Sequence, residues 1–415
     1  MDYKIEELPN FHLHVIKTKK FKNIHVSINF RRLIDKNERT LAAVLQGVLI
    51  NSSKKYKKGK DIEIATEDLY GSYISINSTK SGKCNILSAN TTFLHNKYTE
   101  KGQFQNAVDL LYELILRPNV TNKKFDKKTF DLARNNVRES IESRKDYPGS
   151  YSVSRLLEEI NKDNPVSFKS NLADLKKINV SNLYEYYLDI INNDIIDIFV
   201  IGDVNNEMIE YVKKKFNFKP RDYKKLDHFV IEKNICKKLI TKEALPVNQS
   251  IICLGYVFDD LTPFEARYVM SILNYILGGS SDSLLFKNVR EKESLCYSIS
   301  SSYSLLTGGL LISTGIDKAN FKKTKDLILK QVKDLQAGNF RLSEIKKGKT
   351  CYENSCISML DKIGGIENLY RSILYINSDN IDDKIKKINK VTKKDVVTLA
   401  NKMHLSKIFF LEGDI

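Results

Sequence analysis

The residue types that could bind a metal or act as nucleophiles are widely scattered in this chain. It contains six histidines and six cysteines, and the cysteines show no paired spacing. His12 and His14 would share one face of a strand, but no acidic or cysteine ligand can be located beside them. Cys351 and Cys356 are five positions apart on a predicted helix, off the i, i+4 spacing of helical ligands. We expect these side chains to be structural.

A denser pattern surrounds Arg290 and Tyr297, which are seven positions apart. Residues 277–303 run LGGSSDSLLFKNVREKESLCYSISSSY. The structural explanation is that Arg290 caps a helix or pairs with Glu291 or Glu293 and that Tyr297 opens a strand. Cys296, beside Tyr297, is expected to pack rather than to act as a nucleophile, because no histidine is near in sequence. The chemistry that this segment could support depends on the elements that position it.

The chain is strongly basic, with a net charge of +16. Its basic runs are Lys54–Lys60, Lys123–Lys128, Lys213–Lys215 and Lys384–Lys394. They contain almost no arginine, the residue suited to bidentate contacts with phosphate and guanine, and no nucleic-acid-binding motif accompanies them. We therefore expect a solvated lysine surface and no nucleic-acid function, while an acidic peptide or partner is compatible with the charge.

Composition also limits the class of protein. At 415 residues and 42% hydrophobic content, two or more globular domains are expected. No apolar run approaches the ~20 residues needed to cross a bilayer, and the N-terminus has acids early and no apolar signal-peptide core. The scattered cysteines are expected to be reduced thiols. These features predict a cytoplasmic protein without a membrane segment.

The sequence repeats itself. Residues 176–203 and 386–414 both begin with Lys-Lys-Ile-Asn, continue through a helix-length stretch and an apolar strand, and end in Gly-Asp. The front ends also match: alternating apolar residues at 24–30 predict a half-buried strand before a helix at 38–50. In the second copy a strand at 250–257 precedes Thr262-Pro263-Phe264-Glu265, which is a capping box with proline in the first helical turn.

Each half is predicted to contain two further strands and then a block of helices. These strands are expected at 73–78, 85–93, 296–304 and 309–315. Strands first and helices second predict an α+β fold, in which helices pack on one face of a mostly antiparallel sheet. We predict two tandem homologous domains, 1–218 and 247–415, joined by a linker at 219–246 and forming a bilobed half-shell.

The repeat order, the Gly-Asp strand ends and the LGG…LLF..VRE…L.Y segment together resemble the insulinase (pitrilysin-type, inverzincin) zinc peptidases over essentially the whole chain. The resemblance implies that Arg290 and Tyr297 bind substrate, hydrogen-bonding the backbone carbonyl near the scissile bond. It also implies that the edge strand carrying or adjoining Tyr297 could receive a peptide by strand addition.

The metal motif of that family, H-x-x-E-H, occurs nowhere in the chain. Alignment by the first strand and helix places Ala43 and Gly47 at the two histidine positions and Gln46 at the general base. The third ligand, a glutamate in the family, corresponds best to Ala133 on a helix predicted at 130–145. None of these residues can bind zinc or take a proton from zinc-bound water. We therefore expect no metal, no cofactor and no catalytic residue in this chain.

The resemblance thus implies the non-catalytic subunit of a heterodimeric bacterial peptidase. A zinc-bearing sister subunit would cleave peptides, while this chain closes the chamber and supplies Arg290 and Tyr297. The alternative is an inactive structural or peptide-binding homologue that acts without a proteolytic partner, with a homodimer as one form of it. In either case no activity is expected from this chain alone.

Overall fold

The computed structural model describes residues 2–414 as two compact units, each built around one β-sheet. The first unit contains the described residues of Met1–Glu142, Lys169–His228 and Lys362–Tyr375. The second contains those of Ser143–Phe168, Phe229–Asp361 and Ile376–Ile415. Neither unit is continuous in sequence, so the units differ from a simple division of the chain at 219–246.

The first sheet has six strands in the order β1-β2-β8-β3-β5-β4. Their bounds are β1 (Asp2–Glu7), β2 (His12–Lys17), β8 (Ile195–Gly202), β3 (Asn23–Leu33), β5 (Cys84–Leu94) and β4 (Tyr73–Ser81). The β2–β8 pair is parallel and the other pairs are antiparallel. The sheet is therefore mostly antiparallel, as predicted, although β1 and β2 were not predicted.

The second sheet has five strands in the order β11-β12-β10-β13-β9. Their bounds are β11 (Ile299–Ser304), β12 (Gly309–Ile316), β10 (Ser250–Phe258), β13 (Met403–Gly413) and β9 (Ile240–Leu245). Read from the other edge, this order repeats β2-β8-β3-β5-β4, and β9–β13 is the parallel pair. The shared topology confirms two homologous halves. Strand β9 lies inside the predicted linker, which therefore ends earlier than expected.

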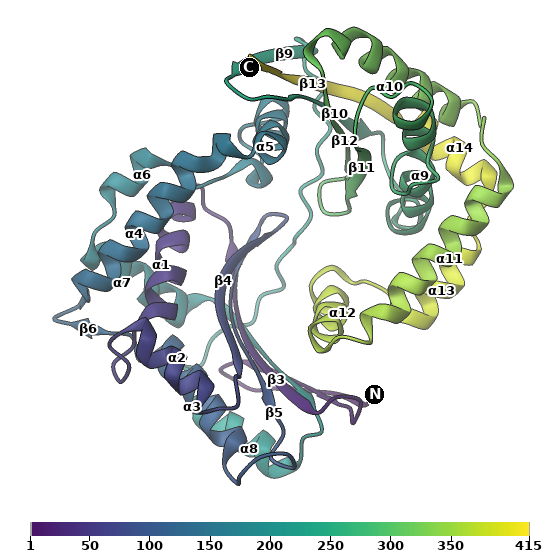
Figure 1. The fold of residues 1–415 in the computed structure, drawn as a ribbon. Helices are drawn as coiled ribbons and strands as arrows, with labels where there is room; N and C mark the ends of the chain where they lie inside the picture. Colours follow the sequence, from purple (N-terminus) through teal and green to yellow (C-terminus); the bar gives the residue numbers. More distant parts are fainter. Residues whose placement is uncertain (1, 415) are drawn as a thin grey trace. The chain divides into compact units, whose positions relative to one another are not determined.

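Helices cover one face of the first sheet, where the even-numbered residues of β3 enter the main core of the unit. Figure 1 shows α1 (Glu38–Asn51) and α3 (Gln103–Leu116) along this face. The unit also contains α2 (Gly59–Glu67), α4 (Lys127–Glu142), α6 (Leu172–Lys177), α7 (Val180–Asn193), α8 (Asn206–Lys215) and the short β6–β7 hairpin (Val120–Thr121, Lys124–Phe125). The helix predicted at 130–145 is α4, which is followed by a 3-10 turn.

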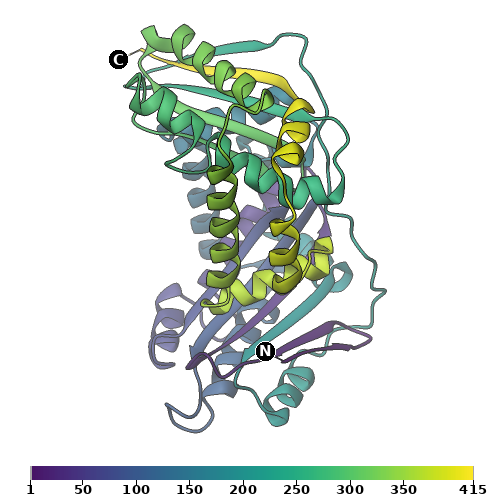
Figure 2. The ribbon, with the colours of Figure 1, turned by 90° about the vertical axis from the view of Figure 1, so that its right-hand side faces the viewer.

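The second unit has an equivalent helical layer. A π-helical turn (Glu265–Val269) leads into α9 (Met270–Leu277), and a second π-helical turn covers Phe286–Glu291. Helices α10 (Phe321–Gln336), α11 (Leu342–Met359), α13 (Ile381–Asn389) and α14 (Lys393–Asn401) complete the layer, with α11 and α13 side by side (Figure 2). The predicted capping box is present, because Glu265 N donates to Thr262 Oγ1 at 3.2 Å and Thr262 N to Glu265 Oε2 at 2.8 Å.

The repeated Gly-Asp sequence has a steric cause. Gly202 has a φ of +143°, and a Cβ there would lie 3.2 Å from the Asn23 carbonyl oxygen. A Cβ at Gly413 would lie 2.4 Å from the Val247 carbonyl oxygen. In both units the end of this strand therefore runs too close to neighbouring backbone for a side chain.

The two units exchange helices, which the sequence did not predict. Helix α12 (Ile363–Ile376), from the second half, lies almost wholly in the first unit, and α5 (Pro148–Ile160), from the first half, lies in the second unit. Each exchanged helix covers the second face of the sheet that receives it. In the second unit Leu156 and Ile160 of α5 pack against Cys253 of β10 and Phe409 of β13. Among the described helices, none is long and apolar enough to cross a membrane.

Candidate functional site

Arg290 and Tyr297 lie close together in the second unit. Arg290 is in the π-helical turn at Phe286–Glu291, and its guanidinium carbon lies 4.3 Å from the Phe286 ring centroid and 5.4 Å from that of Tyr297. Tyr297 is 83% exposed. Both rings lie within the range of cation–π contacts with the guanidinium.

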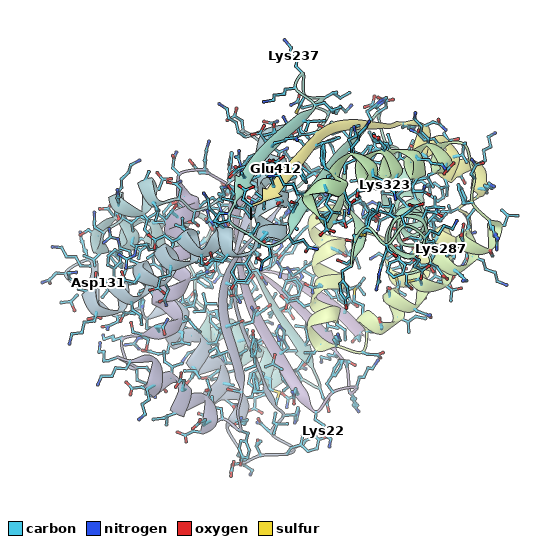
Figure 3. The ribbon with its side chains drawn as sticks, turned by 45° about the horizontal axis from the view of Figure 1, so that its top comes forward. Lys22, Asp131, Lys237, Lys287, Lys323 and Glu412 are labelled. Carbon is cyan, nitrogen blue, oxygen red and sulfur yellow. The ribbon has the colours of Figure 1, made fainter. Side chains whose placement is uncertain are left out.

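One structural explanation for Arg290 was an ion pair with Glu291 or Glu293. Glu293 instead pairs with Lys323 at 2.7 Å, and Glu291 is exposed. Within residues 2–414 the Arg290 guanidinium makes no ion pair, although Lys287 and Lys323, labelled in Figure 3, both have acidic partners. The donors of Arg290 are therefore not committed to a fold-stabilising salt bridge.

The Gly-Gly pair explains how the segment is held beside the edge strand β11. Ser301 N donates to the Gly278 carbonyl oxygen at 3.0 Å, and a Cβ at Gly278 would lie 2.7 Å from that nitrogen. A Cβ at Gly279 would lie 2.8 Å from Asn274 Nδ2. Strand β11 begins at Ile299, so Tyr297 precedes the strand rather than lying in it. A peptide adding to this edge would meet a Ser301 N–H that is already bonded.

Cys296 is unsuited to nucleophilic chemistry. Burial raises the pKa of its thiol, outweighing a hydrogen bond with Thr314 and the charge of Arg290, which both lower the pKa. The neutral thiol is thus favoured, in agreement with the expected packing role.

The positions aligned with the metal motif lie on the side of α1 that faces α4 and the edge strand β4. Gln46 Oε1 accepts a hydrogen bond from Ser78 N of β4 at 2.6 Å. A Cβ at Gly47 would lie 3.1 Å from the Cβ of Ala133, which is buried on α4. The structure therefore brings Gly47 and Ala133 together. Neither the methyl group of Ala133 nor the hydrogen of Gly47 can bind a metal. The Gln46 amide oxygen already accepts a hydrogen bond from the edge strand.

A second cluster was missed by sequence reasoning. Asp197, in the middle of apolar strand β8, lies beside His12 and His14 of β2, and the three could supply ligand atoms within 4.8 Å of one another. The expectation that no acid lies beside these histidines is therefore wrong. A charged residue within the run Ile195–Ile201 was the available signal.

The donors around Asp197 favour an ion-paired network over a metal centre. Its Oδ2 accepts from Arg31 Nε at 2.6 Å and from Tyr375 OH at 3.2 Å, while Oδ1 lies 3.1 Å from His14 Nε2 and 3.2 Å from Tyr223 OH. These contacts occupy the four lone-pair directions of the carboxylate. Burial raises the pKa of Asp197, but Arg31 and His14 lower it more and hold it well below its usual range.

Comparisons with known proteins find similar proteins that are described as inactive peptidases. Residues 177–351 match the family model described as the peptidase M16 inactive domain. The chain is 27% identical over 407 residues to the probable inactive metalloprotease YmfF of Bacillus subtilis, covering 96% of this chain and 95% of YmfF. It is 23% identical over 396 residues to the uncharacterized zinc protease YmxG of the same organism, covering 90% and 93%.

A solved structure is similar from end to end. The crystal structure of a conserved protein from Enterococcus faecalis V583 superposes with a TM-score of 0.91 at 27% identity, covering 100% of this chain and 99% of that one. Together with the match of residues 177–351 to the inactive-domain model, these similarities show that the chain resembles non-catalytic proteins of the M16, or insulinase-type, peptidase family.

Proposed function

We propose that this chain is the non-catalytic subunit of a heterodimeric M16 zinc peptidase. A sister subunit carrying H-x-x-E-H and zinc would cleave peptides, and this chain would bind the peptide backbone through Arg290 and Tyr297. Free thiols at all six cysteines favour a reducing compartment, so we place the complex in the cytoplasm.

The proposal rests on one observation, the contrast between the Arg290–Tyr297 segment and the positions aligned with the metal motif. Tyr297 is exposed beside an Arg290 guanidinium without an ion-pair partner among residues 2–414. An exposed phenol beside a half-buried guanidinium, which also contacts the Phe286 ring, suits hydrogen bonding to a carbonyl whose charge grows during bond cleavage. At the aligned metal positions, in contrast, Gly47 packs against Ala133. The resemblance to both YmfF and YmxG supports descent alongside a zinc-bearing relative.

The test is co-expression with an H-x-x-E-H family member from the same genome. We expect neither chain alone to hydrolyse a fluorogenic peptide, and the co-purified pair to do so in a chelator-sensitive manner. Arg290→Ala and Tyr297→Phe should each lower kcat/KM about a hundredfold, because each removes a donor to the developing oxyanion. Zinc content and heterodimer formation should stay unchanged.

Matched controls lie in the same unit. Lys292→Ala removes an exposed cation two positions from Arg290, and Tyr147→Phe removes the hydroxyl of a tyrosine that is 67% exposed. Both should leave kcat/KM within about twofold. Chelator-sensitive hydrolysis by this chain alone would contradict the proposal. An active pair unaffected by Arg290→Ala and Tyr297→Phe would favour a purely structural role.

A further inference from the structure

Two lysine runs that are far apart in sequence meet on the surface of the first unit. A β-bridge joins Ser53 to Pro118, and Lys54 N donates to the Arg117 carbonyl oxygen at 2.7 Å. Lys57 Nζ donates to Asn119 Oδ1 at 2.8 Å. Figure 1 shows the β6–β7 hairpin beside the loop that follows α1. The runs 54–60 and 123–128 thus form one basic surface.

The charge of this surface is poorly neutralised. Eight exposed lysines of the two runs make no ion pair among residues 2–414: Lys54, Lys55, Lys57, Lys58, Lys60, Lys123, Lys124 and Lys128. Lys127 pairs with Asp131 at 2.6 Å, and Asp131 projects outward from the helix layer in Figure 3. The hairpin tip presents Lys123, which like Asn122 has a positive φ (60° and 50°), the geometry of a type I′ turn.

Two helices begin at this surface, and both place lysines where cations are unfavourable. The N-terminal end of a helix carries partial positive charge. Helix α2 begins at Gly59, directly after Lys57 and Lys58, and the first two residues of α4 are Lys127 and Lys128. Lysines at these ends cost helix stability and add positive charge to the surface, although Asp61 in the first turn of α2 and Asp126 before α4 offset part of it.

A recess lies between these helix ends. We call it the lysine recess; its volume is about 500 Å³, and its wall is mainly apolar. Its lining is Asn51, Lys57, Lys58, Gly59, Asn119, Asp126, Lys128, Thr129 and Leu132. Leu132 is 50% exposed. Asp126 is used internally, because its Oδ2 accepts from Thr129 N at 2.9 Å and from Thr129 Oγ1 at 3.0 Å.

We propose that the lysine recess binds an acidic polypeptide segment that inserts one apolar side chain. The recess would bury the apolar side chain against Leu132 and the aliphatic stems of the lysines, and Lys57, Lys58 and Lys128 would pair with flanking carboxylates. Nucleic acid fits less well, since the lining holds no arginine and no aromatic ring to stack on bases. A membrane surface calls for protruding apolar groups, whereas this apolar surface is recessed.

The inference is independent of the proposed peptidase function and can be tested on the full chain by fluorescence anisotropy. The probe is a labelled twelve-residue peptide of Glu and Ser with a central Leu, compared with the same peptide carrying a central Ser. The combined variant Lys57→Gln/Lys58→Gln/Lys128→Gln should weaken binding of the Leu peptide about tenfold. Leu132→Ser should weaken the Leu peptide severalfold and leave the Ser peptide unchanged.

The control has the same change of net charge at another basic run: Lys386→Gln/Lys390→Gln/Lys394→Gln, all exposed in the second unit. It should change binding less than twofold, and circular dichroism should show that each variant folds. Equal weakening by both triple variants would overturn the proposal in favour of net charge alone. Tighter binding of a uridine oligonucleotide, or of vesicles containing phosphatidylserine, that depends on the recess lysines would overturn it in favour of those ligands.

Discussion

At the scale of residues, the side of α1 aligned with the metal motif has taken on structural roles. Gly47 permits close approach of α4, with its missing Cβ only 3.1 Å from the Ala133 Cβ. Gln46 holds the edge strand through Ser78 N. Neither role uses metal chemistry, so both residues are explained by packing and hydrogen bonding within the first unit.

Restoring a histidine at position 47 should therefore damage the fold. Gly47→His forces a side chain against buried Ala133, and we expect a loss of about 1–3 kcal/mol in the free energy of unfolding, measured by urea denaturation. Ala133→Gly should recover part of this loss. Gly149→His, on α5 where a Cβ meets no atom within 4 Å, is the control and should cost little. Equal losses at both glycines would contradict the packing argument.

The hydrogen bond of Gln46 distinguishes a structural from a catalytic position. Gln46→Glu keeps an acceptor for Ser78 N and should change the free energy of unfolding by less than about 0.5 kcal/mol. Gln46→Leu leaves this backbone donor without its partner and should cost about 1–2 kcal/mol. Thermal unfolding of the two variants tests this, and an equal cost for both would show that the hydrogen bond contributes nothing.

At the scale of elements, α12 is held on the first sheet by buried polar contacts. Glu367 lies 2.8 Å from His25 Nε2 and accepts from Ser27 Oγ at 2.7 Å and Asn29 Nδ2 at 3.3 Å. Further along the helix, the Tyr375 hydroxyl donates to Asp197. The Arg31 guanidinium carbon lies 4.0 Å from the centroid of the Tyr375 ring. The odd-numbered side chains of β3 thus recognise this helix by charge and hydrogen bonds.

The Glu367 contacts predict sensitivity to acid. Burial raises the pKa of Glu367, but His25, Arg371 and Ser27 lower it by a larger amount. The resulting pKa of Glu367 is about 2. Because an unfolded glutamate titrates near ~4.3, the stabilisation is complete above that pH and is lost as the pH falls toward 2. Glu367→Gln should flatten the dependence of unfolding free energy on pH in this window, by roughly 3 kcal/mol in total.

The control for this effect is Glu139→Gln, at an exposed position on α4. It should leave the pH dependence of urea denaturation unchanged. If wild type and Glu367→Gln lost stability in parallel between pH 4.3 and 2, the contribution of Glu367 would be refuted.

The sequence predicted those elements that depend on patterns of neighbouring residues. Alternation at Ile24–Phe30 gave β3, the Thr262–Glu265 box gave the start of the helical segment leading into α9, and the Gly-Asp repeat matched strand ends that exclude a Cβ. Strand β9 was hidden because Ile240–Leu245, with the sequence ITKEAL, lies next to lysine-rich sequence and pairs with β13 some 170 residues away (408 minus 240 is 168).

The helix exchange could not be predicted, because the pattern of apolar residues in a helix does not indicate which sheet the helix will cover. Asp197 was overlooked for a similar reason, since its partner Arg31 is distant in sequence and its partner Tyr375 belongs to the exchanged helix. The proximity of Arg290 to Tyr297 followed from a family resemblance, and its role in substrate binding stays a prediction.

At the scale of the whole molecule, the exchange of α5 and α12 makes the two units mutually dependent. Cutting the chain in the region predicted as a linker leaves residues 1–228 without the helix that covers Asp197 and Arg31. Uncovering buried charges is costly to the folded state of a sheet built around them.

We therefore expect the fragment 1–228 to be poorly folded alone. Mixing it with 229–415 should restore cooperative thermal unfolding, measured by circular dichroism, and Tyr375→Ala in the second fragment should weaken this complementation. For comparison, Tyr223→Phe keeps the ring and removes the two hydrogen bonds of its hydroxyl, to Asp197 and from Arg31. A stable, cooperatively unfolding 1–228 fragment would contradict the dependence.

The late position of α12 in the sequence has a consequence during synthesis. Ribosomes synthesise chains at about 5–20 residues per second. The first sheet therefore stays uncovered on one face until Tyr375, late in the 415 residues, has been synthesised. On that waiting face strand β3 presents His25, Ser27, Asn29 and Arg31, beside the apolar Phe199 and Ile201 of β8. The polar residues of β3 thus reduce the apolar area that the unfinished sheet offers to chaperones or neighbouring chains.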